Sequence, residues 1–156
     1  TSLYYYVRGN IGEKVIEPIP NSIRFLLNDS LAESYVNYPY LPVYGAYKTR
    51  FSINASFQSA MLIMNIDCNV VPGVYTIGGE SGNYCKLAFF GYPHWGYYET
   101  DNLNGGILEI SEVDWEKNRV KGTFQIKVIK KNDYGTLPSP EYYELKEGNF
   151  DIPLYR

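Results

Sequence analysis

Apolar and polar residues alternate with a period of two, and this feature restricts the fold of the chain more than any other. The clearest run covers residues 119–128, where lysine, arginine, threonine and glutamine stand between its apolar members, Val120, Gly122, Phe124, Ile126 and Val128. Successive side chains of a β-strand point to opposite faces of a sheet, so this run predicts a strand with one face in the core and one in water. Residues 22–28 and 48–55 alternate in the same way.

Further strands are predicted at residues 3–8, 61–68, 73–77, 84–90, 107–111, 142–146 and 150–154. About nine or ten strands result, separated by turns rich in glycine, proline and asparagine. Strands with a single buried face are typical of antiparallel sheets, so the predicted fold class is all-β, an antiparallel β-sandwich or a closed or flattened β-barrel. No turn is long enough to be an interdomain linker, so residues 1–156 are predicted to form a single all-β domain.

One short segment favours a helix instead. Ser30 stands three residues before Glu33, which is the spacing of a capping box, and Pro39 ends the segment. At most about two helical turns are therefore expected around Leu31–Val36.

The composition is typical of a turn-rich β protein of the secreted or envelope type, with 17 tyrosines, 14 glycines, 9 prolines and one histidine. The sequence begins Thr1-Ser2 without a methionine, which suggests that a leader or anchor has been removed upstream. We therefore expect an extracytoplasmic location, in the periplasm or on the cell surface.

Net charge and hydropathy argue against two classes of partner. The chain has 14 basic and 17 acidic residues, a net charge of −3, and no concentrated basic surface, so nucleic-acid binding is disfavoured. No run of about 18 apolar residues is present, so the sequence predicts no membrane-spanning helix.

Cys68 and Cys85 are the only cysteines. Each shares the parity of apolar neighbours in its strand, so both thiols are predicted to face inward from neighbouring strands. That geometry permits a disulfide, and it equally suits two buried free thiols.

Aromatic side chains gather in two turn-prone stretches, around residues 92–98 and 35–47. Amphipathic rings with few rotatable bonds suit binding surfaces, and Trp95 is the candidate for stacking on a sugar. The predicted ligand-binding residues are Tyr92, Trp95, Tyr97, Tyr98, Tyr38 and Tyr40. The alternative is that these rings fold back over the ends of the sandwich or barrel and pack there.

Candidates for catalysis are few. Ser81 lacks the final glycine of a nucleophile elbow, and His94 is the only histidine that could serve it. Glu99 and Asp101 lie on the same side of an extended segment and could form the carboxylate pair of a glycoside hydrolase. One histidine and two cysteines are too few ligands for a convincing metal centre. No enzyme, no metal and no cofactor are therefore predicted.

The C-terminal part of the sequence contains a recognisable series of short motifs. It reads Gly106-Ile107-Leu108-Glu109-Ile110, then Asp114, then Asn118-Arg119-Val120-Lys121-Gly122-Thr123-Phe124, and finally Glu147-Gly148-Asn149-Phe150-Asp151-Ile152. Over residues 105–152 this resembles the ending of small uncharacterised lipoprotein domains from Bacteroidetes-type cell envelopes. The resemblance implies export and a lipid anchor on a cysteine upstream of Thr1, and it brings no catalytic residues.

Two glycines of this region are expected to act in folding. Gly122 has an inward position, where the missing side chain lets a neighbouring strand or ring come close, and Gly148 can provide a turn or bulge.

The leading hypothesis is a non-enzymatic envelope domain that binds a glycan or a protein partner through its tyrosine- and tryptophan-rich loops. A lipocalin-like barrel with a small apolar ligand is the alternative, since the inner face is mostly hydrophobic. A glycoside hydrolase that uses Glu99 and Asp101 is the third hypothesis.

Overall fold

The computed structural model describes residues 5–8, 19–35, 43–44, 50–56, 60–68, 70–91, 94–133 and 140–154, and these residues form twelve β-strands. The strands are β1 (Tyr5–Arg8), β2 (Ser22–Leu27), β3 (Ser30–Tyr35), β4 (Val43–Tyr44), β5 (Arg50–Ser56), β6 (Ala60–Asp67), β7 (Gly73–Gly78), β8 (Tyr84–Gly91), β9 (His94–Glu99), β10 (Gly105–Asp114), β11 (Arg119–Asp133) and β12 (Tyr142–Pro153). Ten of them follow one path of pairing, β1-β3-β2-β12-β11-β9-β8-β6-β5-β4, while β10 and β7 branch from β11. Every pairing is antiparallel, which confirms the predicted all-β class.

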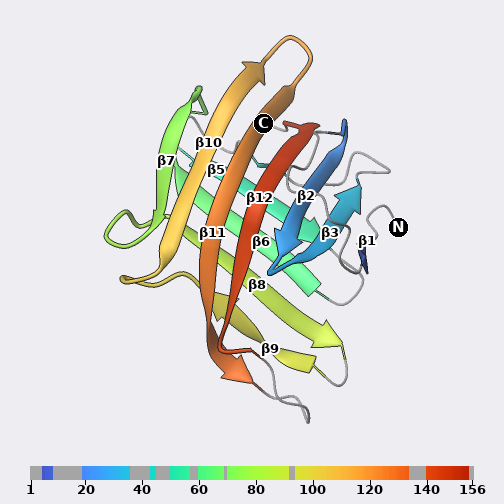
Figure 1. Cartoon of the computed structure of the whole chain (residues 1–156). Helices are drawn as coiled ribbons and strands as arrows, with labels where there is room; N and C mark the ends of the chain where they lie inside the picture. The colour runs from blue at the N-terminus through green and yellow to red at the C-terminus, as the bar shows by residue number, and fades with distance from the viewer. Residues whose placement is uncertain are drawn as a thin grey trace.

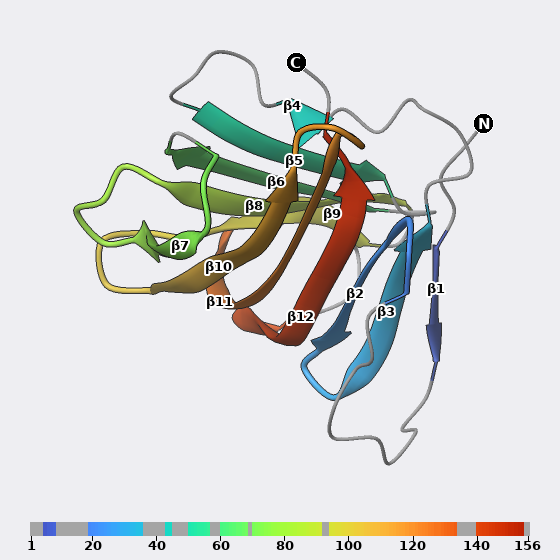
Figure 2. The ribbon, with the colours of Figure 1, turned by 90° about the horizontal axis from the view of Figure 1, so that it is seen from above.

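The sheet divides at the long strand β11. The first half of β11 pairs with β10, from Asp114 opposite Arg119 to Gly106 opposite Ile126, and the second half pairs with β9, beginning with Glu99 opposite Ile129. The front wing consists of β7, β10, the first half of β11, β12, β2, β3 and β1, and the back wing of β9, β8, β6, β5 and β4 (Figure 1). Seen from above, the sheet curls into a half-barrel in which the two wings face each other (Figure 2).

The alternation in β11 produces the two faces that the sequence predicts. Val120 and Val128 are fully buried, while Lys121 and Thr123 are exposed on the opposite face.

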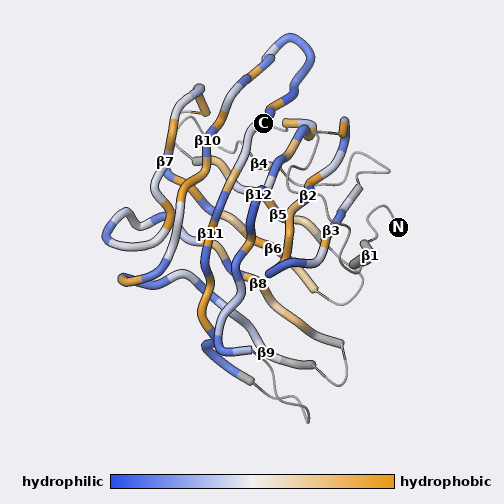
Figure 3. The backbone as a smooth tube through the Cα atoms, in the orientation of Figure 1, coloured by the Kyte–Doolittle hydropathy of each residue, from blue (hydrophilic) through white to orange (hydrophobic). Residues whose placement is uncertain are grey.

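The turn between β10 and β11 is predominantly hydrophilic, as Figure 3 shows.

Phenylalanine rings fill the space between the wings. Phe51 comes from the back wing and lies 6.2 Å from Phe150 of the front wing, measured between ring centroids. Phe124 continues this row, with its centroid 6.4 Å from Phe150 and 5.9 Å from Phe25. Each of the four rings is at most 2% exposed. They occupy the interior where a lipocalin-like barrel would hold its ligand, which counts against that alternative.

The helix expected around Leu31–Val36 is wrong, because residues 30–35 form strand β3. Only Asn28 and Asp29 connect β2 to β3, and Asn28 adopts the positive φ of 54° that tight hairpin turns require. Glu33 does not cap a helix. Its carboxylate oxygen Oε1 lies 2.9 Å from Nη2 of Arg24, its partner across the hairpin. The long-range pairing therefore overrides the local capping signal.

The stretch around residues 92–98 is largely strand rather than loop. Gly91 pairs with His94, so only Tyr92 and Pro93 connect β8 to β9. A second expectation also changes, since the segments predicted as two strands at residues 142–146 and 150–154 form one strand, β12, which ends at Pro153. The register of β12 against β2 shifts between Lys146 and Asn149, so Glu147, which has a φ of 50°, and Gly148 form a bulge.

Cys68 and Cys85 are both buried and both free. The parity argument placed them on the same face, but their positions along the strands differ. Cys85 pairs with Met64, and Cys68 lies four residues farther along the chain from Met64. Four residues of strand span about 13 Å, far beyond the roughly 7 Å between Cα atoms that a disulfide tolerates. The two buried free thiols are therefore the correct alternative.

Candidate ligand-binding groove

The structure describes the side chains of two of the six predicted aromatic residues, Tyr97 and Tyr98. Tyr38, Tyr40 and Tyr92 lie outside the described residues. Trp95 pairs with Phe90 in the ladder of β9 and β8, and its side chain also lies outside the described part. Tyr97 is half-buried, and Nζ of Lys86 lies 4.3 Å from its ring centroid.

Tyr98 packs into the core and is 2% exposed. Its ring centroid lies 4.7 Å from that of Tyr143 and 5.8 Å from that of Phe89, both in edge-to-face geometry. Its hydroxyl donates a hydrogen bond of 2.5 Å to the carbonyl oxygen of Pro140. This tyrosine therefore stabilises the packing between β9 and β12 and presents no ring to a ligand.

The carboxylate of Asp101 organises a turn. Its Oδ1 accepts hydrogen bonds from the backbone N–H groups of Leu103 and Asn104, both at 2.8 Å. The Leu103 hydrogen bond is the main cause of a lowered pKa for Asp101, and the Asn104 side chain adds to it. A general acid needs a raised pKa, so Asp101 is poorly suited to that role.

Ser81 and His94 flank strand β8 at its opposite ends. Ser81 precedes Tyr84, and His94 pairs with Gly91 at the far end of the strand. The length of β8 separates them by about 25 Å. Ser81 instead closes its own turn, because its hydroxyl donates to the carbonyl of Gly78 at 2.7 Å.

A groove of about 390 Å³ opens on the outer face of the front wing, beside the division of the sheet. Its lining includes Gly105 and Gly106 of β10, Gln125 and Lys127 of β11, and Glu144 and Lys146 of β12, with Ile107 as an aliphatic wall. The pairing of β11 with β10 ends at Ile126 and that with β9 begins at Ile129. Lys127 and Val128 therefore lie in the interval between these two ladders.

The two glycines of the groove are required by the close approach of neighbouring strands. A Cβ on Gly106 would stand 1.9 Å from the carbonyl oxygen of Gln125, and one on Gly105 would stand 2.0 Å from that of Ile77. No side chain can be added without moving the backbone, so this side of the groove consists of bare main chain.

The charged groups of the groove differ in their partners. Nζ of Lys146 lies 3.3 Å from Glu144 and 3.5 Å from Asp29. The hydrogen bond to Glu144 is the main cause of a raised pKa for Lys146. In contrast, Nζ of Lys127 lies over the ring of Tyr142, 4.3 Å from its centroid. The groove thus combines an amide, a carboxylate and two ammonium groups.

Sequence reasoning did not find this groove. The available signal is the glycine pair at the start of a strand, which marks a close backbone approach.

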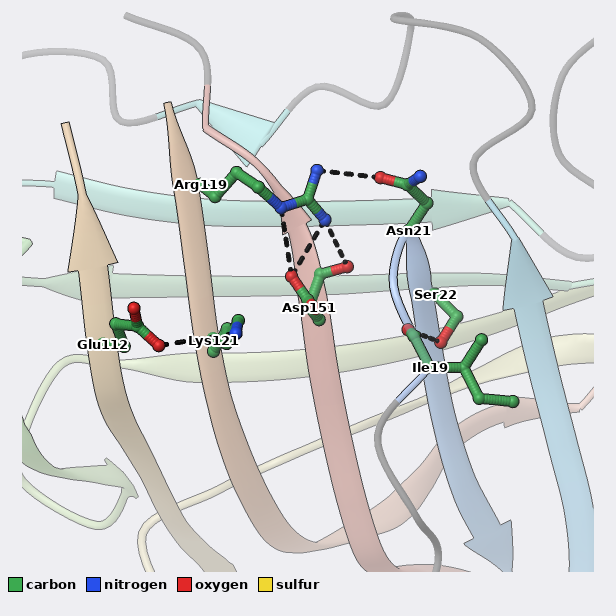
Figure 4. A network of polar contacts seen from close by, with 7 residues as sticks. All are labelled: Ile19, Asn21, Ser22, Glu112, Arg119, Lys121 and Asp151. Carbon is green, nitrogen blue, oxygen red and sulfur yellow. Dashed lines mark hydrogen bonds and ion pairs between the residues drawn. The ribbon is translucent and has the colours of Figure 1, made fainter. Parts of the chain in front are cut away.

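A separate polar network, shown in Figure 4, links β11, β12 and the turn before β2. Arg119 donates from Nη2 to Oδ1 of Asp151 at 2.8 Å and from Nη1 to Oδ1 of Asn21 at 2.9 Å. The guanidinium thereby joins β11 and β12 to the turn before β2. Because Asp151 is nearly buried between these strands, the network is structural.

In the part of the chain that the structure describes, no three histidine, cysteine, aspartate or glutamate side chains gather as a metal site would require. Within the same residues no helix has the length and apolar character to cross a membrane. Comparisons with protein-family models, curated proteins and solved structures find no match to the chain. The resemblance of residues 105–152 to envelope lipoprotein domains therefore stays a prediction.

Proposed function

We propose that the chain is a non-enzymatic binding domain that holds a saccharide in the groove at Gly105 and Gly106. The observation that carries this proposal is the set of groups around one concave site. Saccharide hydroxyls need both donors and acceptors, and the groove offers Gln125, Glu144, Lys127 and Lys146. Its volume of about 390 Å³ lies within the range of small-molecule sites, roughly 300–1,000 Å³.

Apolar surface beside these groups suits the C–H faces of a sugar ring. Ile107 is 50% exposed in the wall, and Tyr142, which contacts Lys127, is 45% exposed. An exposed aliphatic side chain and an exposed ring next to hydrogen-bonding groups are typical of amphipathic ligand sites.

The number of carboxylates in the groove and their partners favour binding over catalysis. Glu144 is the one carboxylate among the described residues that line the groove, and it pairs with Lys146. Hydrolysis of a glycosidic bond requires two carboxyl groups across the ligand, one of them protonated. Asp101 serves a turn instead.

A glycan is favoured over a protein partner because the groove is concave and places hydrogen-bonding and charged groups beside a small apolar wall, whereas protein interfaces are broad and have apolar centres. Export, an envelope location and a lipid anchor, which the resemblance implies, belong to this proposal. The β8–β9 hairpin with Trp95 and Tyr97 remains the second candidate location for the same ligand.

The test is a titration of the ¹⁵N-labelled protein with neutral and acidic oligosaccharides, followed by NMR. We expect the Gly105 and Gly106 amide signals to shift first, and Gln125→Ala to weaken binding roughly threefold to tenfold. Thr123→Ala is the matched control, since Thr123 is an exposed residue of the same strand and does not line the groove.

A double variant, Trp95→Ala with Tyr97→Ala, distinguishes the two locations. If this double variant binds the oligosaccharide as tightly as wild type and Gln125→Ala binds it more weakly, the groove is the binding site. The opposite result moves the site to the β8–β9 hairpin, and no binding to any oligosaccharide at about 1 mM rejects the function.

A further inference from the structure

We propose that the ligand of the groove is an acidic saccharide and that Lys127 determines this specificity by pairing with the sugar carboxylate. This inference rests on the proposed function, because it names the class of saccharide for the same groove. It starts from the different surroundings of the two ammonium groups.

The charge of Lys146 is compensated within the protein. Glu144 and Asp29 lie on either side of its ammonium, at 3.3 and 3.5 Å. A ligand carboxylate at Lys146 would have to compete with both. Lys146 therefore helps to hold Glu144 in place and is poorly placed to receive an anion.

Lys127 lacks this compensation. Glu144 is its direct partner across β11 and β12, but the Glu144 carboxylate turns to Lys146. Among the described residues, the contact of the Lys127 ammonium is the ring of Tyr142 rather than a carboxylate. An ammonium has three N–H donors, so it can remain over the ring and still donate to an anion.

The position of Lys127 fits this role. Its side chain is half-buried and lines the groove, in the interval of β11 between the ladders with β10 and β9. A carboxylate on a sugar seated against Gly105 and Gly106 would meet a cation that is partly shielded from water, where an ion pair is stronger than on an open surface. A neutral sugar would gain no such contact.

The experiment compares a galacturonate trimer with its methyl ester, two ligands that share a skeleton and differ in charge. Affinity is measured by calorimetry, and the Gly105 and Gly106 amides report by NMR whether the ligand occupies the groove. We expect the acid to bind about tenfold more tightly than the ester, with the difference decreasing at high salt.

Lys127→Met should remove the preference: the acid loses an ion pair and about tenfold in affinity, whereas the ester loses at most one hydrogen-bond donor and weakens less. Lys121→Met is the matched control, since Lys121 is exposed on the same face of β11, pairs with Glu112 at 3.4 Å and does not line the groove. Lys127→Gln provides a second variant, and thermal unfolding of all three verifies that they fold.

The outcomes separate the two proposals. Equal affinity for acid and ester, or a preference retained in Lys127→Met, overturns the acidic specificity while binding in the groove stands. No shift of the Gly105 and Gly106 amides with either ligand overturns the acidic specificity, and the same silence with the neutral oligosaccharides overturns the saccharide site as well.

Discussion

The ring of Phe150 lies directly against Gly122, its partner across β11 and β12, so that a Cβ on Gly122 would stand 2.4 Å from Cζ of Phe150. The pair Phe124 and Gly148 makes the same contact with the strands exchanged: the glycine is in β12 and the ring in β11. A Cβ on Gly148 would stand 2.4 Å from Cε2 of Phe124. The two rings therefore interleave across the ladder. The sequence-based expectation that Gly122 admits a neighbouring ring is confirmed.

Gly122→Ala should destabilise the protein by about 3 kcal/mol, because the new methyl group would stand 2.1 Å from the carbonyl oxygen of Glu109 and 2.4 Å from the ring of Phe150, so that strand β10 and the ring must both move. The free energy of unfolding in urea measures the effect. Gly73→Ala is the control, since its Cβ would meet the nearest atom at an ordinary 3.4 Å. Adding Phe150→Leu to Gly122→Ala should recover part of the loss, and strictly additive changes in the double variant would contradict the contact.

The strands that the sequence predicted well are those that expose one face. β11 is the clearest case, since Lys121, Thr123 and Lys127 each stand between buried residues of the same strand. β3 was missed because its polar residue Glu33 is buried in an ion pair with Arg24. In this strand, polar residues therefore do not mark an exposed face, and no alternation of polar and apolar residues appears in the sequence. β9 was missed because Tyr97 and Tyr98 place the same residue type on both faces.

The groove could not be predicted because it depends on register. The sequence predicts the strands at residues 107–111 and 119–128, but not that β11 pairs with β10 only as far as Ile126 and with β9 from Ile129 onward. Such long-range choices depend on bulges and on the pairing of distant strands, and local patterns carry little information about either.

Glu33→Gln should be strongly destabilising, because it leaves the Arg24 guanidinium with a weaker partner in a buried site. The carboxylate of Glu33 is 1% exposed and accepts from Nε of Arg24 at 3.0 Å. Removing one member of a buried pair typically costs about 3–5 kcal/mol. Chemical denaturation checks this, with Glu112→Gln as the control because the Glu112–Lys121 pair is exposed on both sides. Equal losses in the two variants would contradict a special role for the buried pair.

Asp101 should contribute to stability in a pH-dependent manner. Its folded-state pKa is lowered from 3.8, mainly by the Leu103 backbone hydrogen bond, so the contribution is fully present above pH 3.8 and is lost as the pH falls through the folded-state pKa. Denaturation of wild type and Asp101→Asn across this acid range should give curves that converge at low pH. A ¹³C titration of the carboxyl group should give a pKa below 3.8. A value above 3.8 would be incompatible with the turn geometry.

Cys85 should resist alkylation as long as the protein remains folded. The residue is 0% exposed, and burial raises the pKa of its thiol, so both access and the thiolate population oppose reaction. Cys68, which is 9% exposed, should react faster. Iodoacetamide labelling followed by mass spectrometry measures each site, with Cys68→Ser isolating the slower one. After unfolding without reductant, both thiols should label completely, because the strand register holds them about 13 Å apart along the native strands. Resistance to labelling in the unfolded chain until a reductant is added would show a disulfide and would contradict the register of β6 against β8.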